Sequence, residues 1–428
     1  MQRLFRFLGP SRSFRSLLVA ALSDELAKGI ATFLLPIVAI TLTSSPVHVA
    51  AVTVSLTLPW LVVGPVAGLI VDRFDRRRLL VGAEVTRLAA LLLLAVALIA
   101  GVASLPMLYA VALVVGVTET AIEPALMATI PRVSRRSHLD QVNARVIGSR
   151  TIADNIAQVV SGALASVSLG VTAIAAAIGF AVAGGGYRRM RGVFASRPPR
   201  GEVAGRQLGA ARVRETGRAI LGGMAVIRST EPLRTITIAS GVINGCWAAW
   251  WSVWALYVVA PGPVGLTPFG MGLLMTVGAV ASLLGAALAL PIQQRFGRRW
   301  AIGINILGNA ALFAITAVTS EIWPIVLAML LGDFGAPGWA VAANTWQQRN
   351  VPESLRGRVA SAYRVLGFGA KAIGAAAGGV VAARLGIPTL YAICAVGTLA
   401  TMVPFFRHVT ESAMAPPAGP DRRVRTQN

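Results

Sequence analysis

About twelve stretches of apolar residues recur along the chain, each near the length of about 20 residues that a helix needs to cross a lipid bilayer. They cover residues 17–42, 48–71, 79–101, 105–130, 143–166, 169–186, 233–260, 266–292, 299–319, 322–346, 359–384 and 387–406. Only 13% of the residues are charged, whereas charged residues make up about a quarter of a typical soluble domain. The sequence therefore predicts an all-α integral membrane protein with about 12 transmembrane helices.

Basic residues are concentrated in alternate loops of the chain. The 39 lysines and arginines outnumber the 17 acidic residues and leave a net charge of +22. The loops near Ser44, Ser104, Gly262 and Thr319 have almost none of them. Because basic residues accumulate in cytoplasmic loops, we expect a multi-pass protein of the inner (cytoplasmic) membrane with both termini in the cytoplasm. This placement accounts for the positive charge, so membrane lipid, and not nucleic acid, is the expected partner.

Two halves of the chain repeat each other. The motif Asp72–Arg77 recurs as Gln294–Arg299, and Pro131 recurs as Pro352, each about 220 residues later. The repeat predicts two pseudo-symmetric six-helix halves with a substrate site between them near the middle of the membrane. We expect the halves at residues 1–186 and 233–411, a cytoplasmic Arg-rich linker at 187–232, and a disordered cytoplasmic tail at 412–428.

A loop dense in arginine separates the second and third predicted spans. The residues Gly68, Asp72, Arg73, Arg76 and Arg77 follow the pattern Gly-x-x-x-Asp-Arg-x-x-Arg-Arg. This pattern resembles the loop between helices 2 and 3 of the major facilitator superfamily, although Asp75 stands where that family usually has glycine. The resemblance implies the superfamily's fold and a gating latch that opens as the two halves rock. Gly64 and Gly68, one helical turn apart, also predict the close approach of a neighbouring helix.

The second half contains a copy of this loop without its acidic residue. Arg295, Arg298 and Arg299 repeat the arginines, but Gln294 replaces the aspartate. We therefore expect a latch that pairs charges asymmetrically.

Further segments resemble one branch of the superfamily, which contains the enterobactin exporter and the macrolide efflux proteins. These segments are Ala21–Leu26, Pro59–Leu80, Pro124-Ala125 and Gln348–Val359. The resemblance implies a monomeric secondary transporter that exports siderophores, antibiotics or other hydrophobic small molecules by proton antiport. An importer or uniporter of a small polar metabolite, and a receptor that does not transport, remain alternatives. The few Asn and Gln residues in the spans argue against a sugar as substrate.

Four acidic residues within the predicted spans are candidates for proton coupling, because an ionisable group in the membrane is costly and needs a reason. They are Asp24, Glu119, Glu123 and Asp333. Asp24 and Lys28, four residues apart, could instead form a structural ion pair. Glu119 and Glu123 share one helical face and could share a proton, or one of them could pair with Arg150.

Arg150 and Asp154 are also four residues apart, which favours a self-neutralised pair on the fifth span. On the second half, Lys371 is a candidate cation facing Asp333.

A stripe of tryptophan follows one face of the seventh predicted span. Trp247, Trp250, Trp251 and Trp254 have the spacing i, i+3, i+4 and i+7. Such a stripe could line a substrate cavity for flat solutes, or it could form an aromatic belt at the membrane interface.

Motifs of other protein classes are missing from the sequence. There is no phosphate-binding Gly-x-x-x-x-Gly-Lys-Ser/Thr loop, and His48, His138 and His408 lie far apart in the chain. We therefore expect no enzymatic activity, cofactor or metal site, with protons and a small molecule as the ligands.

Overall fold

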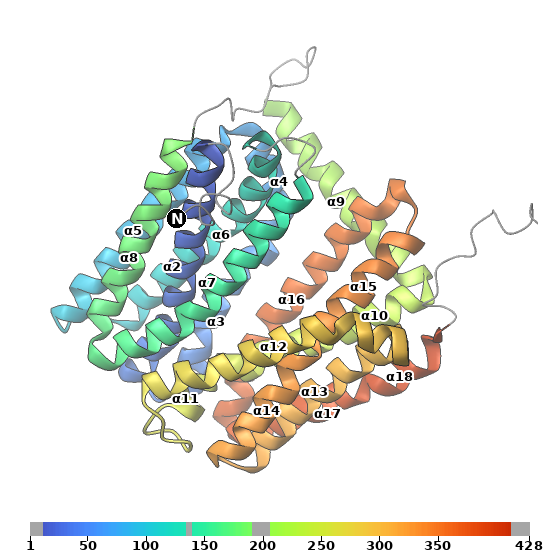
Figure 1. The fold of residues 1–428 in the computed structure, drawn as a ribbon. Helices are drawn as coiled ribbons and strands as arrows, with labels where there is room; N and C mark the ends of the chain where they lie inside the picture. Colours follow the sequence, from blue (N-terminus) through green and yellow to red (C-terminus); the bar gives the residue numbers. More distant parts are fainter. Residues whose placement is uncertain (1–11, 134–138, 191–205, 412–428) are drawn as a thin grey trace, which may run out of the picture. The chain divides into compact units, whose positions relative to one another are not determined.

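The computed structural model describes residues 12–133, 139–190 and 206–411, and helices dominate all three ranges (Figure 1). The helices of the first range and of the second are α2 (Arg12–Leu42), α3 (Pro46–Val62), α4 (Gly64–Arg73), α5 (Arg76–Ile99), α6 (Leu105–Val133), α7 (Leu139–Val167) and α8 (Leu169–Arg189). In the third range they are α9 (Arg206–Ser229), α10 (Glu231–Ser252), α11 (Trp254–Val258), α12 (Pro268–Phe296), α13 (Arg298–Val318), α14 (Ile322–Phe334), α15 (Ala336–Asn350), α16 (Glu353–Leu385), α17 (Ile387–Ala400) and α18 (Met402–His408).

Every predicted span coincides with one helix or with two consecutive helices, which confirms the all-α membrane fold. In the part of the chain that the structure describes, nine helices are long and apolar enough to cross a membrane. The other three predicted spans fall outside these nine. Two are interrupted, at Val63 between α3 and α4 and at Val253 between α10 and α11, and α7 contains the charged residues Arg145, Arg150 and Asp154.

The chain divides into two compact units. Unit 1 comprises residues 1–216, 251–276 and 375–383, and unit 2 comprises residues 217–250, 277–374 and 384–428. The predicted halves and linker remain predictions. The tail predicted at residues 412–428 lies outside the described residues.

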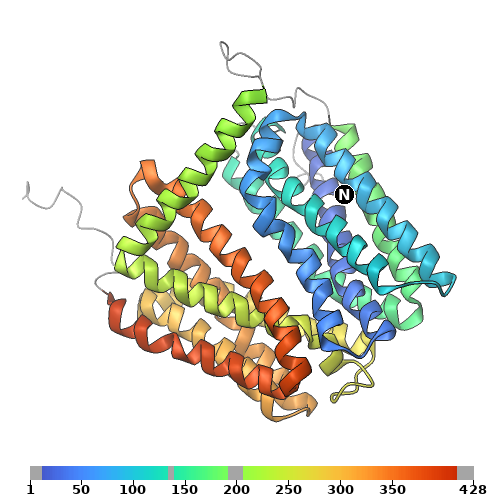
Figure 2. The ribbon, with the colours of Figure 1, turned by 180° about the vertical axis from the view of Figure 1, so that it is seen from behind.

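Unit 1 is organised around α2. This helix packs against α6, α7 and α8, while α5 packs against α6 and α8; α5 and α8 run side by side in both views (Figures 1 and 2). A buried apolar cluster that includes Leu34, Leu91 and Phe180 fills the space between these helices. Because α2 is enclosed by its neighbours, the polar groups on its central turns are withdrawn from lipid.

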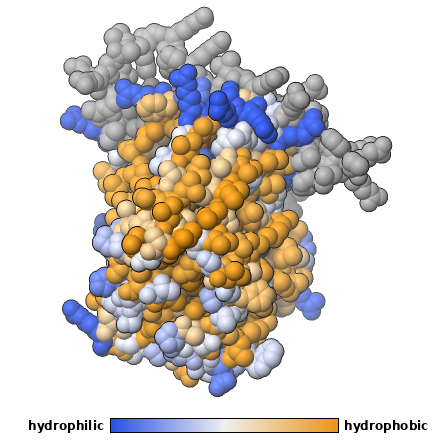
Figure 3. Space-filling model, turned by 90° about the vertical axis from the view of Figure 1, so that its left-hand side faces the viewer, coloured by the Kyte–Doolittle hydropathy of each residue, from blue (hydrophilic) through white to orange (hydrophobic). Residues whose placement is uncertain are grey.

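The outer face of α5 is apolar as a membrane-facing surface should be. Leu93, Val96 and Ile99 are exposed on this helix, and Figure 3 shows a broad band of hydrophobic residues with hydrophilic residues above and below it. Exposed apolar side chains of this kind fit a lipid environment.

Unit 2 is organised around α13, which packs against α14, α15 and α17. Its apolar cluster includes Ile302, Trp346 and Phe405. The break between α14 and α15 falls at Gly335, just ahead of Pro337, which has no N–H to continue a helix. The break divides the tenth predicted span into two helices.

Candidate functional site

Seven charged side chains form an ionic network inside unit 1, on helices α2, α5, α6 and α7. The members are Asp24, Glu25, Lys28, Arg87, Glu119, Glu123 and Arg150. At its centre, an Nη of Arg87 lies 2.8 Å from Oδ1 of Asp24, and the other Nη contacts Glu119. Nε of Arg87 donates to Oγ1 of Thr118 at 2.6 Å. The guanidinium lies 5.3 Å from the ring centre of Phe180, so its surroundings are both ionic and aromatic.

Two further cations complete the network. Lys28 contacts Glu25 on its own helix, and its Nζ lies 3.3 Å from Oε1 of Glu119. Arg150 bridges two acids, with Nε 2.5 Å from Oε2 of Glu25 and an Nη 2.8 Å from Oε2 of Glu123. Such pairs are tolerated in the interior because each charge has partners at hydrogen-bonding distance.

Asp24 and Lys28 do not form the ion pair with each other that their spacing suggested as one alternative. The two residues lie four apart on α2, yet Asp24 contacts Arg87 and Lys28 contacts Glu25 and Glu119. A cation from another helix therefore replaces the local pair. The role of Asp24 in proton coupling remains a prediction.

The two glutamates of α6 contact different cations. Glu119 contacts Lys28 and Arg87, whereas Glu123 contacts Arg150. The alternative in which Arg150 pairs with one of them is the arrangement that the structure contains. The predicted self-neutralised pair of Arg150 and Asp154 is wrong, because the guanidinium reaches across to α2 and α6 instead.

Sequence reasoning missed Glu84 and Arg87, both on α5. Each side chain is fully buried, with 0% exposure. The signal was present in the sequence, since two ionisable residues three apart interrupt a long apolar helix.

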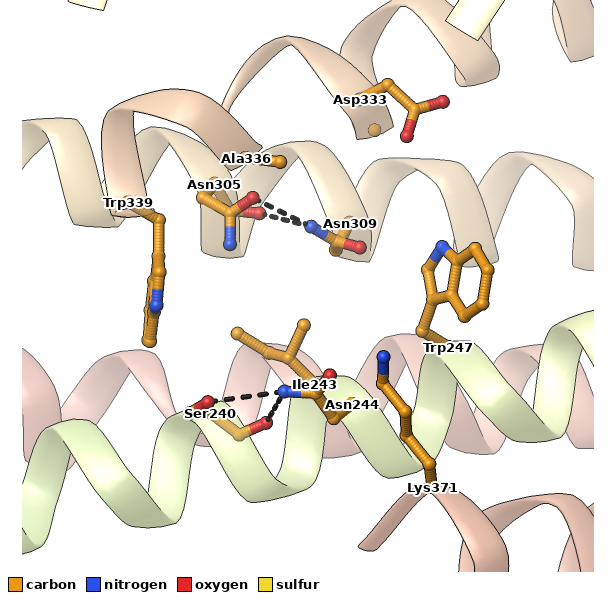
Figure 4. A pocket seen from close by; sticks show the side chains of 11 residues that line it. Ser240, Ile243, Asn244, Trp247, Asn305, Asn309, Asp333, Ala336, Trp339 and Lys371 are labelled. Carbon is orange, nitrogen blue, oxygen red and sulfur yellow. Dashed lines mark hydrogen bonds between the residues drawn. The ribbon is translucent and has the colours of Figure 1, made fainter. Parts of the chain in front are cut away.

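A second candidate site is a pocket of about 310 Å³ inside unit 2. Figure 4 shows its walls: Ser240, Asn244 and Trp247 project from α10, Asn305 and Asn309 from α13, Asp333 from α14, Trp339 from α15 and Lys371 from α16. Two internal hydrogen bonds order the amides, from Asn309 to Asn305 Oδ1 at 3.1 Å and from Asn244 to Ser240 Oγ at 3.2 Å. The pocket therefore combines amides, indoles and one charge of each sign.

The two charges of this pocket come from different helices. Lys371 Nζ lies 5.9 Å from the ring centre of Trp247 and 5.6 Å from that of Phe368, within cation–π range. Asp333 has no ion pair or hydrogen bond within the described ranges, and its carboxylate lies against Gly278 of α12. Both predicted residues therefore line one pocket; their function there remains a prediction.

The four tryptophans of the stripe lie in different environments. Trp247 lines the pocket, whereas Trp250 is 1% exposed and donates from Nε1 to Thr316 at 3.3 Å. Trp254 is fully buried and stacks on Tyr257 with ring centres 6.0 Å apart. Trp251 is half-buried. The burial of Trp250 and Trp254 contradicts the alternative of a lipid-facing belt, because a belt needs its rings at the surface.

The arginines of the first gating loop bind helix ends within unit 1. Arg76 donates to the carbonyl oxygen of Ala128 on α6 at 3.1 Å, and Arg77 donates to that of Arg188 on α8. Asp75, which replaces the family glycine, caps α5 by accepting from the backbone N–H of Arg78 at 3.0 Å. The bond from Arg77 satisfies a carbonyl group that the end of α8 leaves open. Arg73 is exposed.

Two further expectations for this loop concern Asp72 and the glycines Gly64 and Gly68. The side chain of Asp72 lies outside what the structure describes, so its part in a latch remains a prediction. No described atom lies within 4 Å of a methyl group placed on Gly68. Among the described atoms, Trp60 of the preceding helix lies within 4 Å of a methyl group placed on Gly64, and the close approach of a neighbouring helix remains a prediction.

In the second gating loop, Arg299 makes the contact that Arg77 makes in the first, but a different acid caps the helix that follows. Arg299 donates to the carbonyl oxygen of Phe406 on α18, as Arg77 does to Arg188 on α8. Glu411 accepts from the backbone N–H groups of Arg298 and Arg299 at 2.8 and 3.1 Å. An acid from beyond α18 thus caps α13. Arg295 lies 5.8 Å from the ring centre of Phe296.

No group of three or more His, Cys, Asp or Glu side chains within residues 12–133, 139–190 and 206–411 is placed to hold a metal ion.

The comparison with protein families shows which family the chain belongs to. The sequence model of a family described as transmembrane secretion effector, MFS_3, matches residues 9–417. The chain belongs to this family of the major facilitator superfamily. It is therefore a multi-pass membrane transporter, and a transporter of this kind acts on small molecules.

Individual relatives of this transporter match only part of it. An uncharacterized MFS-type transporter of Mycobacterium tuberculosis is 33% identical over 109 residues, which are 26% of this chain and 24% of the relative. The fosmidomycin resistance protein of Escherichia coli is 30% identical over 128 residues, 29% of this chain and 31% of the relative. The matches thus span less than a third of either relative.

Solved structures share the fold over nearly the whole chain. The nucleoside transporter NupG has a TM-score of 0.73 at 14% identity and covers 92% of this chain and 98% of its own. A bacterial homologue of the iron transporter ferroportin has a TM-score of 0.70 at 15% identity, covering 94% and 98%. At this identity the likeness extends to the fold alone.

Proposed function

We propose that this transporter exports a small hydrophobic or amphipathic molecule, of drug, antibiotic or siderophore type, in exchange for protons. Alternating access by rocking of the two halves would carry the solute outward across the cytoplasmic membrane. The family description names secretion, and one relative is named as a resistance protein. Both support export, as does the resemblance to the branch of the enterobactin exporter and the macrolide efflux proteins.

The pocket of unit 2 is the observation that supports an amphipathic substrate. Its indoles, Trp247 and Trp339, offer flat apolar contact, and Asp333 and Lys371 offer one charge of each sign. An amphipathic solute could place its ring against Trp247, where Lys371 now lies, and its polar group between the two charges. Pockets that combine mostly apolar walls with a few polar groups are typical of small-molecule sites.

A small polar metabolite is the second candidate substrate, in either direction of transport. The scarcity of Asn and Gln in the spans was an argument against one such metabolite, a sugar. The fold gathers Asn244, Asn305 and Asn309 into one pocket with Ser240. A site with this many amides can hydrogen-bond a polar solute, so overall scarcity no longer excludes it.

Retention of a compound panel in an efflux-deficient bacterial host tests the proposal. The panel would contain siderophores, macrolides, cationic dyes and, for the second candidate, nucleosides. Each compound is measured with and without an uncoupler, in wild type and in Trp247→Ala. Trp323→Ala is the matched control, because Trp323 is 78% exposed on α14 and outside the pocket.

We expect reduced retention of at least one amphipathic compound, abolished by the uncoupler and by Trp247→Ala but not by Trp323→Ala. Retention lowered only for nucleosides would favour the polar substrate. Increased accumulation in the presence of the transporter would reverse the proposed direction. An unchanged response to the uncoupler would remove proton antiport.

A further inference from the structure

Glu84 is an acidic side chain that the ionic network of unit 1 leaves without a partner. It lies on α5 with 0% exposure, and neither carboxyl oxygen has a hydrogen-bond partner within the described ranges. Its side chain packs beside Gly184 of α8, where an added methyl group would come 3.3 Å from Cβ of Glu84. An ionised carboxylate in such a place would cost far more free energy than a neutral carboxylic acid.

The charge balance around Glu84 leads to the same conclusion. With Glu84, the buried cluster has five carboxyl groups, Asp24, Glu25, Glu84, Glu119 and Glu123, against three cations, Lys28, Arg87 and Arg150. Every carboxyl group except Glu84 contacts at least one of the cations. Five carboxyl groups against three cations leave an excess of two negative charges, and a proton on Glu84 removes one of them.

Asp24 provides an acceptor for that proton. Its Oδ1 binds Arg87 at 2.8 Å, but its Oδ2 is buried without a hydrogen-bond partner in the described chain. Asp24 is also one of the acids that lie near Glu84. Two carboxyl groups without donors between them become satisfied when one carries a proton and donates it to the other.

We propose that Glu84 binds the proton that this transporter exchanges, and that its carboxyl O–H donates to Oδ2 of Asp24. This inference rests on the proposed antiport and moves the proton site to a residue outside the four acids predicted from sequence. Glu119 and Glu123 are less suited, because each of them already contacts a cation.

Release of the proton can be followed through the neighbouring groups. The O–H bond of Glu84 breaks, its electron pair stays on the new carboxylate, and the proton passes to Oδ2 of Asp24 and then to water. Arg87, three residues along α5, is the cation next to the new charge. Glu84 would then compete with Asp24 and Glu119 for its guanidinium, which couples proton loss to the contacts between α5, α2 and α6. On the α8 side, the group facing this cluster is the buried Tyr187.

Infrared spectroscopy of the purified full-length protein tests the site without a substrate. A protonated carboxyl group has a carbonyl band apart from that of carboxylates, and the band can be followed over a pH series. Wild type, Glu84→Gln and Glu84→Asp would be compared. Glu321→Gln is the matched control, because Glu321 is an exposed acid that precedes α14.

We expect a band that titrates in wild type and in Glu321→Gln, shifts its midpoint in Glu84→Asp and is lost in Glu84→Gln. A band that persists unchanged in Glu84→Gln would overturn the proposal, since the proton would sit elsewhere. So would a band that never titrates while the protein is folded, since that proton would be structural.

Transport in proteoliposomes separates this inference from the proposed function. With a substrate from the compound panel, Glu84→Gln should lose accumulation driven by a pH gradient but keep exchange of labelled for unlabelled substrate. Equal pH-driven accumulation in Glu84→Gln and wild type would refute the role of Glu84 in coupling. If no panel compound is transported, the proposed function fails, while the infrared result still decides whether Glu84 binds a proton that titrates.

Discussion

The guanidinium of Arg87 lies 2.8 Å from Oδ1 of Asp24, and both side chains are fully buried, with 0% exposure. The pair joins α5 to α2 across 63 positions of sequence. Because α2 is the helix around which unit 1 packs, this contact sets the position of the acid that the sequence put forward for proton coupling. It also leaves Oδ2 of the same carboxylate available to Glu84.

Replacement of Arg87 by methionine should destabilise the protein strongly. The change leaves the buried carboxylates of Asp24 and Glu119 without the guanidinium, and removing one partner of a buried ion pair costs about 3–5 kcal/mol. Thermal unfolding in detergent measures the loss. The double variant Arg87→Met, Asp24→Leu should recover much of it, because Glu119 keeps Lys28 as a partner. Additive losses in the double variant would mean that the two residues do not interact energetically.

Replacement of Asp72 by asparagine should slow transport several-fold while leaving the protein folded and inserted. The reason is the resemblance of its loop to a gating latch, in which the aspartate contacts a helix end and an arginine and these contacts break as the two halves rock. Transport rates at equal expression measure the effect, with the exposed Glu215→Gln as control. Equal rates in Asp72→Asn and wild type would remove Asp72 from any latch.

Alanine at position 278 should displace the carboxylate of Asp333. A methyl group on Gly278 would collide with Oδ2 of Asp333 and approach Met329, and overpacking of this kind costs about 1–3 kcal/mol. We expect weaker substrate binding, measured by the concentration that gives half-maximal transport. Gly367→Ala is the control, since no described atom lies within 4 Å of its new methyl group. The same loss in both variants would show that the effect does not depend on the contact with Asp333.

Removal of the Glu411 side chain should loosen the start of α13. Its carboxylate accepts two backbone N–H groups there, and the loss of a helix cap costs about 1 kcal/mol. Hydrogen exchange of the Arg298 and Arg299 amides should rise in Glu411→Ala. Glu321→Ala is the comparison, because Glu321 precedes α14 without a side-chain cap. Unchanged exchange in Glu411→Ala would show that the cap contributes little in solution.

The local features of the chain were readable from its residues. Apolar length identifies a membrane helix without reference to its neighbours, so every predicted span has its helix, from α2 to the pair α17 and α18. The repeat of Arg77 at Arg299 was also visible, and the two side chains bind equivalent helix ends.

Contacts between helices could not be predicted from local composition or from spacing along one helix. Spacing on one helix suggested that Asp24 pairs with Lys28 and Arg150 with Asp154, but the partners come from α5, α2 and α6. The stripe of tryptophan likewise separates into Trp247 at a pocket and Trp250 in the core.

The sequence by itself determined the membrane-spanning helices, their approximate bounds and the family, because these depend on local composition and on motifs. Only the tertiary structure decided which charges meet, that Glu84 is left without a cation, and that three asparagines share one pocket with Asp333 and Lys371. The physical reason is that an ion pair or a pocket depends on how helices distant in sequence rotate and pack against one another, which the periodicity of a single helix does not specify.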